Sequence, residues 1–197
     1  MKREISDFRL LVETTIDAYT KCRSAEHEQR FAHQNFTGAR LSEELEKIND
    51  EIQIQRSRSA RMLGELRDGI LDGIAAKREK LVVQGEANKL NTDKLGDFAF
   101  LELPVILEKA ELEELYNRNW ANPVFVRGLE GYLTKHNLPF QFKDPLTSAQ
   151  TKIGNVFKHF ERYTTDPLLM DSMIANPTFF TSWEEELSAT LGAVEEL

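Results

Sequence analysis

Apolar residues recur at helical spacing along the N-terminal half of the chain. From Ile5 to Cys22 they follow steps of three and four, with Thr15 in one of the positions, which places them along one side of a helix. The same spacing restarts at Leu41, one residue out of phase, and Gly38 lies where the phase changes. We therefore predict two long helices that separate at Gly38, since glycine readily adopts the left-handed conformation that ends many helices. One continuous helical rod is the alternative.

The apolar side chains of both helices form a seam that must be covered by another surface. Predicted helices of about 30 and about 40 residues are long for a self-contained domain, and such a seam does not bury itself. We therefore expect the protein to associate with itself, as a homodimer or a higher oligomer. The seam consists of Ile5, Phe8, Val12, Tyr19, Leu41, Leu45, Ile48, Ile52, Leu63, Leu66 and Ile70.

The C-terminal half has a different composition. All six prolines follow residue 103, and nine of the twelve phenylalanines and both tryptophans follow residue 97. Prolines interrupt helices and large rings fill compact cores, so a smaller, mainly helical domain is expected there. The predicted fold class is all-α, with a long N-terminal helical hairpin or coiled coil over residues 1–92 and an aromatic-rich domain over 93–197. The loop-like composition of 84–96 predicts a linker between them.

Two segments of the C-terminal half resemble each other. ANPVFVRGLEGYL, residues 121–133, and ANPTFFTSWEEEL, residues 175–187, match at six of thirteen positions. Asn caps a helix and Pro suits its first turn, so each ANP predicts a helix corner followed by a buried Phe. The two are either independent corners or halves of a pseudo-symmetric domain. The repeated positions are Asn122, Pro123, Phe125, Asn176, Pro177 and Phe179.

Between these corners, prolines interrupt any helix. Phe140 and Phe142 alternate as in a short strand, and Asp144 with Pro145 predicts the start of a further helix. The segment DPLLMDSMIANPTFF, residues 166–180, resembles the short helical repeats opened by Asp-Pro or Asn-Pro in stress-inducible co-chaperones. That resemblance implies helices that cradle a hydrophobic peptide.

Charge is distributed unevenly along the chain. Up to Thr92 there are 16 basic and 16 acidic residues, whereas from Asp93 onward there are 9 and 17, which accounts for the net charge of −8. A balanced segment suits a solvated helix with ion pairs, and an acidic domain repels phosphate groups. Nucleic acid is therefore not the expected partner of the C-terminal domain.

Three arginines form the densest basic cluster. Arg56, Arg58 and Arg61 lie in a polar stretch of the second predicted helix and are candidates for contact with phosphate or an acidic partner. The alternative is a solvated face on which Arg61 pairs with Glu65, one turn later. The absence of interleaved aromatic residues favours this alternative.

No motif in the sequence indicates catalysis. His27 and His33 lie on different faces of a helix, His136 and His159 stand alone, and Cys22 is the only cysteine. Neither a phosphate-binding glycine loop nor a nucleophile motif occurs. We expect no catalytic residue, no metal and no cofactor. Without a signal-peptide pattern or a membrane-spanning apolar run, the expected location is the cytoplasm, with no membrane partner.

These patterns favour a non-enzymatic assembly, scaffolding or adaptor protein. It would self-associate through its N-terminal helices and bind another protein through its C-terminal domain. The layout resembles that of scaffolding and adaptor proteins, including those that help viral or prophage particles assemble. The alternatives are an acidic inhibitor that imitates nucleic acid, and a co-chaperone-like binder of hydrophobic peptides.

Overall fold

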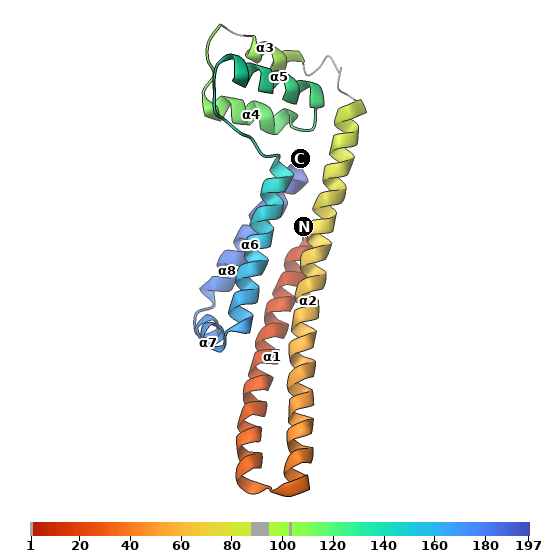
Figure 1. Ribbon diagram of the computed structural model, residues 1–197, viewed down its shortest axis with the longest axis vertical. Coiled ribbons are helices and arrows are strands. Elements are labelled where there is room, and N and C mark those ends of the chain that lie inside the picture. Colours follow the sequence, from red (N-terminus) through yellow and green to blue (C-terminus); the bar gives the residue numbers. More distant parts are fainter. Residues whose placement is uncertain (1, 88–94, 103) are drawn as a thin grey trace. The chain divides into compact units, whose positions relative to one another are not determined.

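The computed structural model describes residues 2–87, 95–102 and 104–197, and in these ranges it contains eight helices and no strand. Two long helices come first and six shorter ones follow (Figure 1). The all-α fold class, with a long N-terminal helical hairpin and a smaller helical C-terminal region, is thereby confirmed.

Helices α1 (Lys2–Asn35) and α2 (Gly38–Ala87) form an antiparallel hairpin (Figure 1). Gly38 has a φ of +60°, the left-handed conformation that its position at the phase change predicted. The turn closes with a bond from the Phe36 amide to the Ala32 carbonyl, 2.9 Å long. The break at Gly38 is therefore confirmed, and the continuous rod is excluded.

The described residues fall into two compact units. Unit 1 comprises Met1–Ile70 and Lys152–Leu197, and unit 2 comprises Leu71–Thr151. The predicted boundary at residue 92, and most of the predicted linker over 84–96, fall on 88–94, outside the described residues. Residues 93–197 are shared between the two units, because the helices at the C-terminal end group with the hairpin.

Unit 1 joins the two ends of the chain through an aromatic core. Its C-terminal part consists of most of α6 (Pro145–Thr165) together with α7 (Pro167–Ala175) and α8 (Thr178–Glu196). Phe8 of α1 lies in ring contact with Phe157 and Phe160 of α6, with centroid separations of 6.0 and 5.8 Å. The largest fully buried side chains of this unit are Phe8, Leu11, Ile153, Phe157, Phe160, Met170, Met173 and Leu187.

Unit 2 has a separate core. It is built by α3 (Leu95–Leu101), α4 (Lys109–Asn119) and α5 (Pro123–Lys135). The core side chains are Leu107, Leu112, Leu115, Phe125, Leu129 and Tyr132. Phe140 and Phe142 pack against this core without forming the predicted strand, and Phe142 stacks on Tyr116 at 5.4 Å. An irregular segment suffices here because the two rings are held by side-chain packing rather than by a strand partner.

The first Asn-Pro corner forms as predicted. Asn122 Oδ1 accepts bonds from the amides of Val124 and Phe125, at 3.0 and 3.2 Å, and Pro123 is the first residue of α5. Helix α6 likewise begins at Pro145, where Asp144 Oδ1 accepts the Thr147 amide at 2.8 Å. Two of the three helix starts predicted from Asn or Asp followed by Pro are therefore confirmed.

The second Asn-Pro corner is built differently. Asn176 ends α7, and α8 begins one residue after Pro177, so Pro177 caps the helix instead of opening it. The corner that matches Asn122-Pro123 in geometry is Asp166-Pro167, whose Asp166 Oδ1 accepts the amides of Leu168 and Leu169. Asn176 Oδ1 instead accepts the Thr178 amide at 3.4 Å and the Thr178 hydroxyl at 2.6 Å.

The idea of a pseudo-symmetric domain is wrong. Phe125 belongs to unit 2 and is fully buried, whereas Phe179 belongs to unit 1 and is only half-buried. The two corners therefore do not occupy equivalent core positions, and the interpretation as independent corners holds.

Replacement of Gly38 by alanine should destabilise the protein by about 1–2 kcal/mol, because a Cβ is unfavourable at positive φ. Urea unfolding followed by circular dichroism measures the change. The matched control is Gly69→Ala in the interior of α2, where a Cβ meets open space and should stabilise the helix by up to ~1 kcal/mol. Equal effects of the two substitutions would contradict the left-handed turn.

Acid stability should depend on the pair that joins α1 to α8. Arg9 donates from Nε to Glu184 Oε2 at 2.9 Å, and this bond and the nearby charge lower the pKa of Glu184 from its usual 4.5. The pair therefore stabilises the fold above pH 4.5, and this stabilisation is lost as pH falls through the lowered pKa. In thermal melts from about pH 6 to about pH 3, Glu184→Gln should lose less stability than the wild type. Glu185→Gln, on the exposed neighbour, should behave as the wild type.

Candidate functional site

The sequence-predicted seam is largely covered within one copy of the chain. Phe8, Val12, Ile52, Leu63 and Ile70 are buried. The remaining seam residues, Ile5, Tyr19, Leu41, Leu45, Ile48 and Leu66, are half-buried. Phe8 is covered by α6, and Ile52 packs with Cys22 and Ala25 across the hairpin. The buried seam residues are thus not open to a second copy while this fold is intact.

The three predicted arginines do not form one patch. Arg56 lines a cavity, whereas Arg58 does not, and Arg61 pairs with Glu65 at 3.7 Å. The Arg61–Glu65 pair is the arrangement that the spacing of four residues predicted. Of the three, Arg56 alone is positioned at a concave surface, where an anion would be partly shielded from solvent.

The cavity lies in unit 1 between α1, α2, α6 and α7, and has a volume of about 530 Å³. Its lining is mixed: apolar side chains such as Leu63, Phe160 and Met170 occur beside hydroxyls, three arginines and the carboxylates of Glu26 and Glu161. Cys22 also lines it, and burial raises the pKa of its thiol while the Arg56 guanidinium opposes this shift. The thiol is therefore in its neutral, weakly nucleophilic form at neutral pH.

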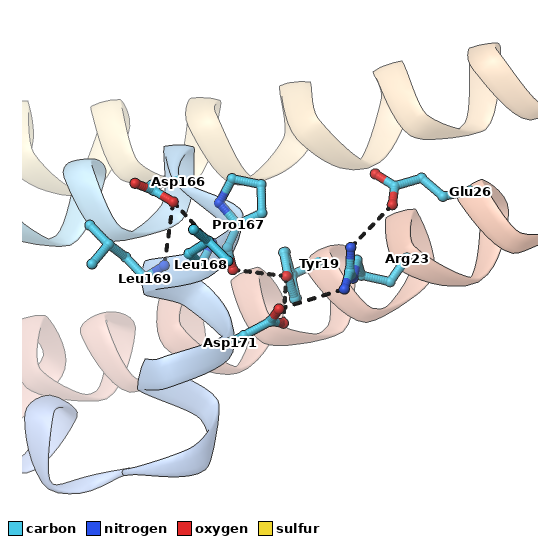
Figure 2. A network of polar contacts seen from close by, with 8 residues as sticks. All are labelled: Tyr19, Arg23, Glu26, Asp166, Pro167, Leu168, Leu169 and Asp171. Atoms are coloured by element: carbon cyan, nitrogen blue, oxygen red, sulfur yellow. Dashed lines mark hydrogen bonds and ion pairs between the residues drawn. The ribbon is translucent and has the colours of Figure 1, made fainter.

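One edge of the cavity is fixed by a polar network between α1 and α7 (Figure 2). Tyr19 Oη lies 2.6 Å from Asp171 Oδ1 and 3.1 Å from the Pro167 carbonyl oxygen, and both oxygens accept from it. Arg23 lies between two carboxylates, 3.5 Å from Asp171 Oδ2 and 3.4 Å from Glu26 Oε2. Arg23 is therefore neutralised by the protein itself, which leaves its charge unavailable to a ligand.

The hairpin tip is a second candidate site, defined by Phe31, Phe36 and Arg40. Phe31 is 60 % exposed and touches the Phe36 ring edge-on at 6.3 Å. The Arg40 guanidinium lies over Phe36, 4.5 Å from the ring centroid. An aromatic pair with an arginine is the composition found at the centres of protein interfaces.

Sequence reasoning missed the tip, although a signal was present. The segment from Gln29 to Ser42 holds two arginines, one histidine and two phenylalanines but not a single carboxylate. In a chain of net charge −8, such a segment is locally basic. The apolar seam weakens here, and helical periodicity gives no signal for an exposed ring such as Phe31.

The described residues contain no group of three or more His, Cys, Asp or Glu side chains that could hold a metal ion. His27, His33 and His159 are exposed, and His136 lies against the Tyr132 ring at 4.4 Å. Among the helices that the structure describes, none is both long and apolar enough to cross a membrane.

Comparisons of the chain with protein-family models, with curated proteins and with solved structures gave no match. The hairpin tip and the cavity of unit 1 are therefore the two candidate sites of this protein.

The Tyr19 network should be visible in a titration. Burial and the bond to Asp171 raise the pKa of Tyr19 to about 12 from its usual 10.0. Because the folded-state pKa is raised, the network stabilises the fold below pH 10 and loses this effect as pH rises through about 12. The tyrosinate absorbance of the wild type minus that of Tyr19→Phe should therefore show one tyrosine that ionises near pH 12. Ionisation near pH 10 would contradict the bond.

Proposed function

We propose that this protein is a non-enzymatic adaptor that binds a protein partner through the tip of its helical hairpin. The observation that carries the proposal is the exposed Phe31 ring in contact with the half-buried Phe36, against which Arg40 is stacked. Contact between water and the exposed aromatic surface of the tip is unfavourable, and burial of this surface in a partner's pocket removes the unfavourable contact. Arginine and aromatic side chains, phenylalanine among them, are also enriched at protein interfaces.

The charge of the tip selects the kind of partner. Arg30, His33 and Arg40 lie in a segment without carboxylates, while the chain as a whole is acidic. An acidic surface with an apolar pocket complements this tip, and opposite charge speeds the encounter. We accordingly propose a protein partner whose acidic residues surround a pocket for one phenylalanine.

This proposal changes two features of the function expected from the sequence. Self-association through the apolar seam is not part of it, because Phe8, Ile52 and Leu63 are buried within one copy. The proposed partner site is the tip, where the Phe31 ring is exposed, and not the C-terminal domain that the sequence favoured. Assembly of several copies is retained only as an outcome of the test, since the acidic surface of a second copy has the charge that the tip favours.

Photocrosslinking from the tip tests the proposal. A benzophenone side chain at position 31 should give one discrete covalent product with another protein when cells that make this chain are irradiated. The matched control places the same group at Ile54, which is 62 % exposed on the same hairpin but lies outside the tip. Ile54 should give no such product. Mass spectrometry then identifies the captured protein.

The purified partner allows a quantitative measurement. Arg40→Glu should weaken its binding by about 10-fold or more, with the loss growing at low salt, because the substitution removes a cation and places a like charge against an acidic surface. Arg61→Glu, on the same helix outside the tip, should change affinity by less than about 2-fold.

A crosslinked product with a second copy of the chain would make the tip a self-association site. Identical products from positions 31 and 54, or none from either, would overturn the proposal.

A further inference from the structure

The geometry points to a binding site for a small organic carboxylate with an apolar body in the cavity of unit 1. This site is separate from the hairpin tip and does not depend on the adaptor function. The cavity volume of about 530 Å³ lies within the range of sites that hold small molecules. Its lining has a polar part at Thr15, Ser59 and Arg56 and an apolar part at Leu63, Phe160 and Met170.

Two hydroxyl groups in the lining have no partner. Thr15 is 5 % exposed, and neither its Oγ1 nor the buried Oγ of Ser59 has a hydrogen-bond partner among the described residues. A buried hydroxyl without a partner costs free energy, so its presence in a cavity wall indicates a ligand atom that completes the bond. Both residues line the cavity.

The two hydroxyls face each other across the hairpin. The Cys22 thiol lies 4.0 Å from the Ile52 carbonyl oxygen, which sets the register of α1 against α2. In an antiparallel pair with this register, Thr15 and Ser59 lie at the same level, since each is seven residues from that contact. The hydroxyls therefore approach one position in the cavity from opposite helices.

Arg56 supplies a positive charge next to this position. It lies three residues before Ser59, on the same face of α2, and it lines the cavity. In the described part of the chain, Arg56 has no carboxylate within ion-pair distance, whereas Arg23 is held by Glu26 and Asp171. A ligand carboxylate at this point would accept bonds from a guanidinium and two hydroxyls, the charge-assisted arrangement that carboxylates favour.

Part of the remaining wall fits an apolar body. Beyond Ser59, α2 contributes Ala60, Leu63 and Gly64, and α6 and α7 contribute Phe160 and Met170. The polar side chains of Arg67, Glu161, Thr164 and Thr165 also line the cavity. A Cβ at Gly64 meets open space, so this part of the wall has room for an alkyl chain. The proposed ligand is an amphipathic monoanion such as a medium-chain fatty acid.

Calorimetric titration with decanoate tests the site in the full-length protein. One decanoate should bind per chain, whereas decyltrimethylammonium, with a cationic head, should not. Arg56→Gln should weaken decanoate binding by about 10- to 100-fold, the usual effect of a lost charge-assisted bond. The control Arg58→Gln, two residues away and outside the cavity, should bind within about 2-fold of the wild type.

A variant that fills the cavity tests where the apolar part of the ligand lies, independently of charge. Gly64→Leu should fill the cavity and abolish decanoate binding while it raises the melting temperature, because leucine favours the helix more than glycine does. Gly69→Leu, at an open site outside the cavity, should raise the melting temperature and leave binding unchanged.

Several results of these titrations would contradict the proposed carboxylate site. No heat with decanoate, or equal binding of decanoate and decyltrimethylammonium, would overturn the proposal. Equal losses for Arg56→Gln and Arg58→Gln would also overturn it, since they would indicate a general charge effect. Retention of binding by a folded Gly64→Leu variant would show that the ligand lies elsewhere.

Discussion

The structure of unit 1 depends on the burial of one face of α1 against α6. Phe8 at the start of the chain is enclosed by Phe157 and Phe160, more than a hundred residues later. Full burial of a ring of this size contributes about 1.5–3 kcal/mol relative to leaving it exposed. This contact joins the N-terminal and C-terminal helices into one unit. The Arg9–Glu184 pair then fixes α8 against α1, and the Tyr19–Asp171 bond fixes α7 against α1.

The same packing explains why the hairpin tip differs from the rest of α1. Near the tip, the inward positions of α1 are the small residues Ala25 and Ala32, both buried. Small side chains let two helices approach each other but leave little apolar surface to be covered. The larger Phe31 ring is exposed here and contacts the half-buried Phe36, over which Arg40 lies. A self-contained hairpin has no structural need for such rings, which is why they argue for a partner.

Much of the local structure could be predicted from the sequence, and the packing could not. The phase change at Gly38 and the capping residues Asn122 and Asp144 act through short-range backbone chemistry, so a few residues were enough to place the helix ends. Periodicity identifies which face of a helix is apolar but not what covers it, so the seam was assigned to a second copy when part of it belonged to α6. The prediction for the second Asn-Pro corner was wrong for a related reason. The packing of α7 and α8 sets where each helix ends, and six identical residues in a thirteen-residue match do not determine that packing. The tip was missed because exposure of a single ring has no periodic signal.

The cavity follows from the size of the residues where α1 and α2 meet α6. Thr15, Ala18 and Cys22 on α1 lie opposite Ser59, Ala60 and Gly64 on α2, and all six line the cavity. Side chains this small cannot fill the space between two helices while Phe160 and Met170 occupy the third side. An ordinary core would close such a gap with leucine or isoleucine, which the chain uses on α2 before and after the cavity at Ile52 and Ile70. The small residues occur together with two unpartnered hydroxyls and an arginine that lacks a carboxylate partner in the described part of the chain. Poor packing alone accounts for a gap but not for polar groups that converge on it, and a bound anion accounts for both.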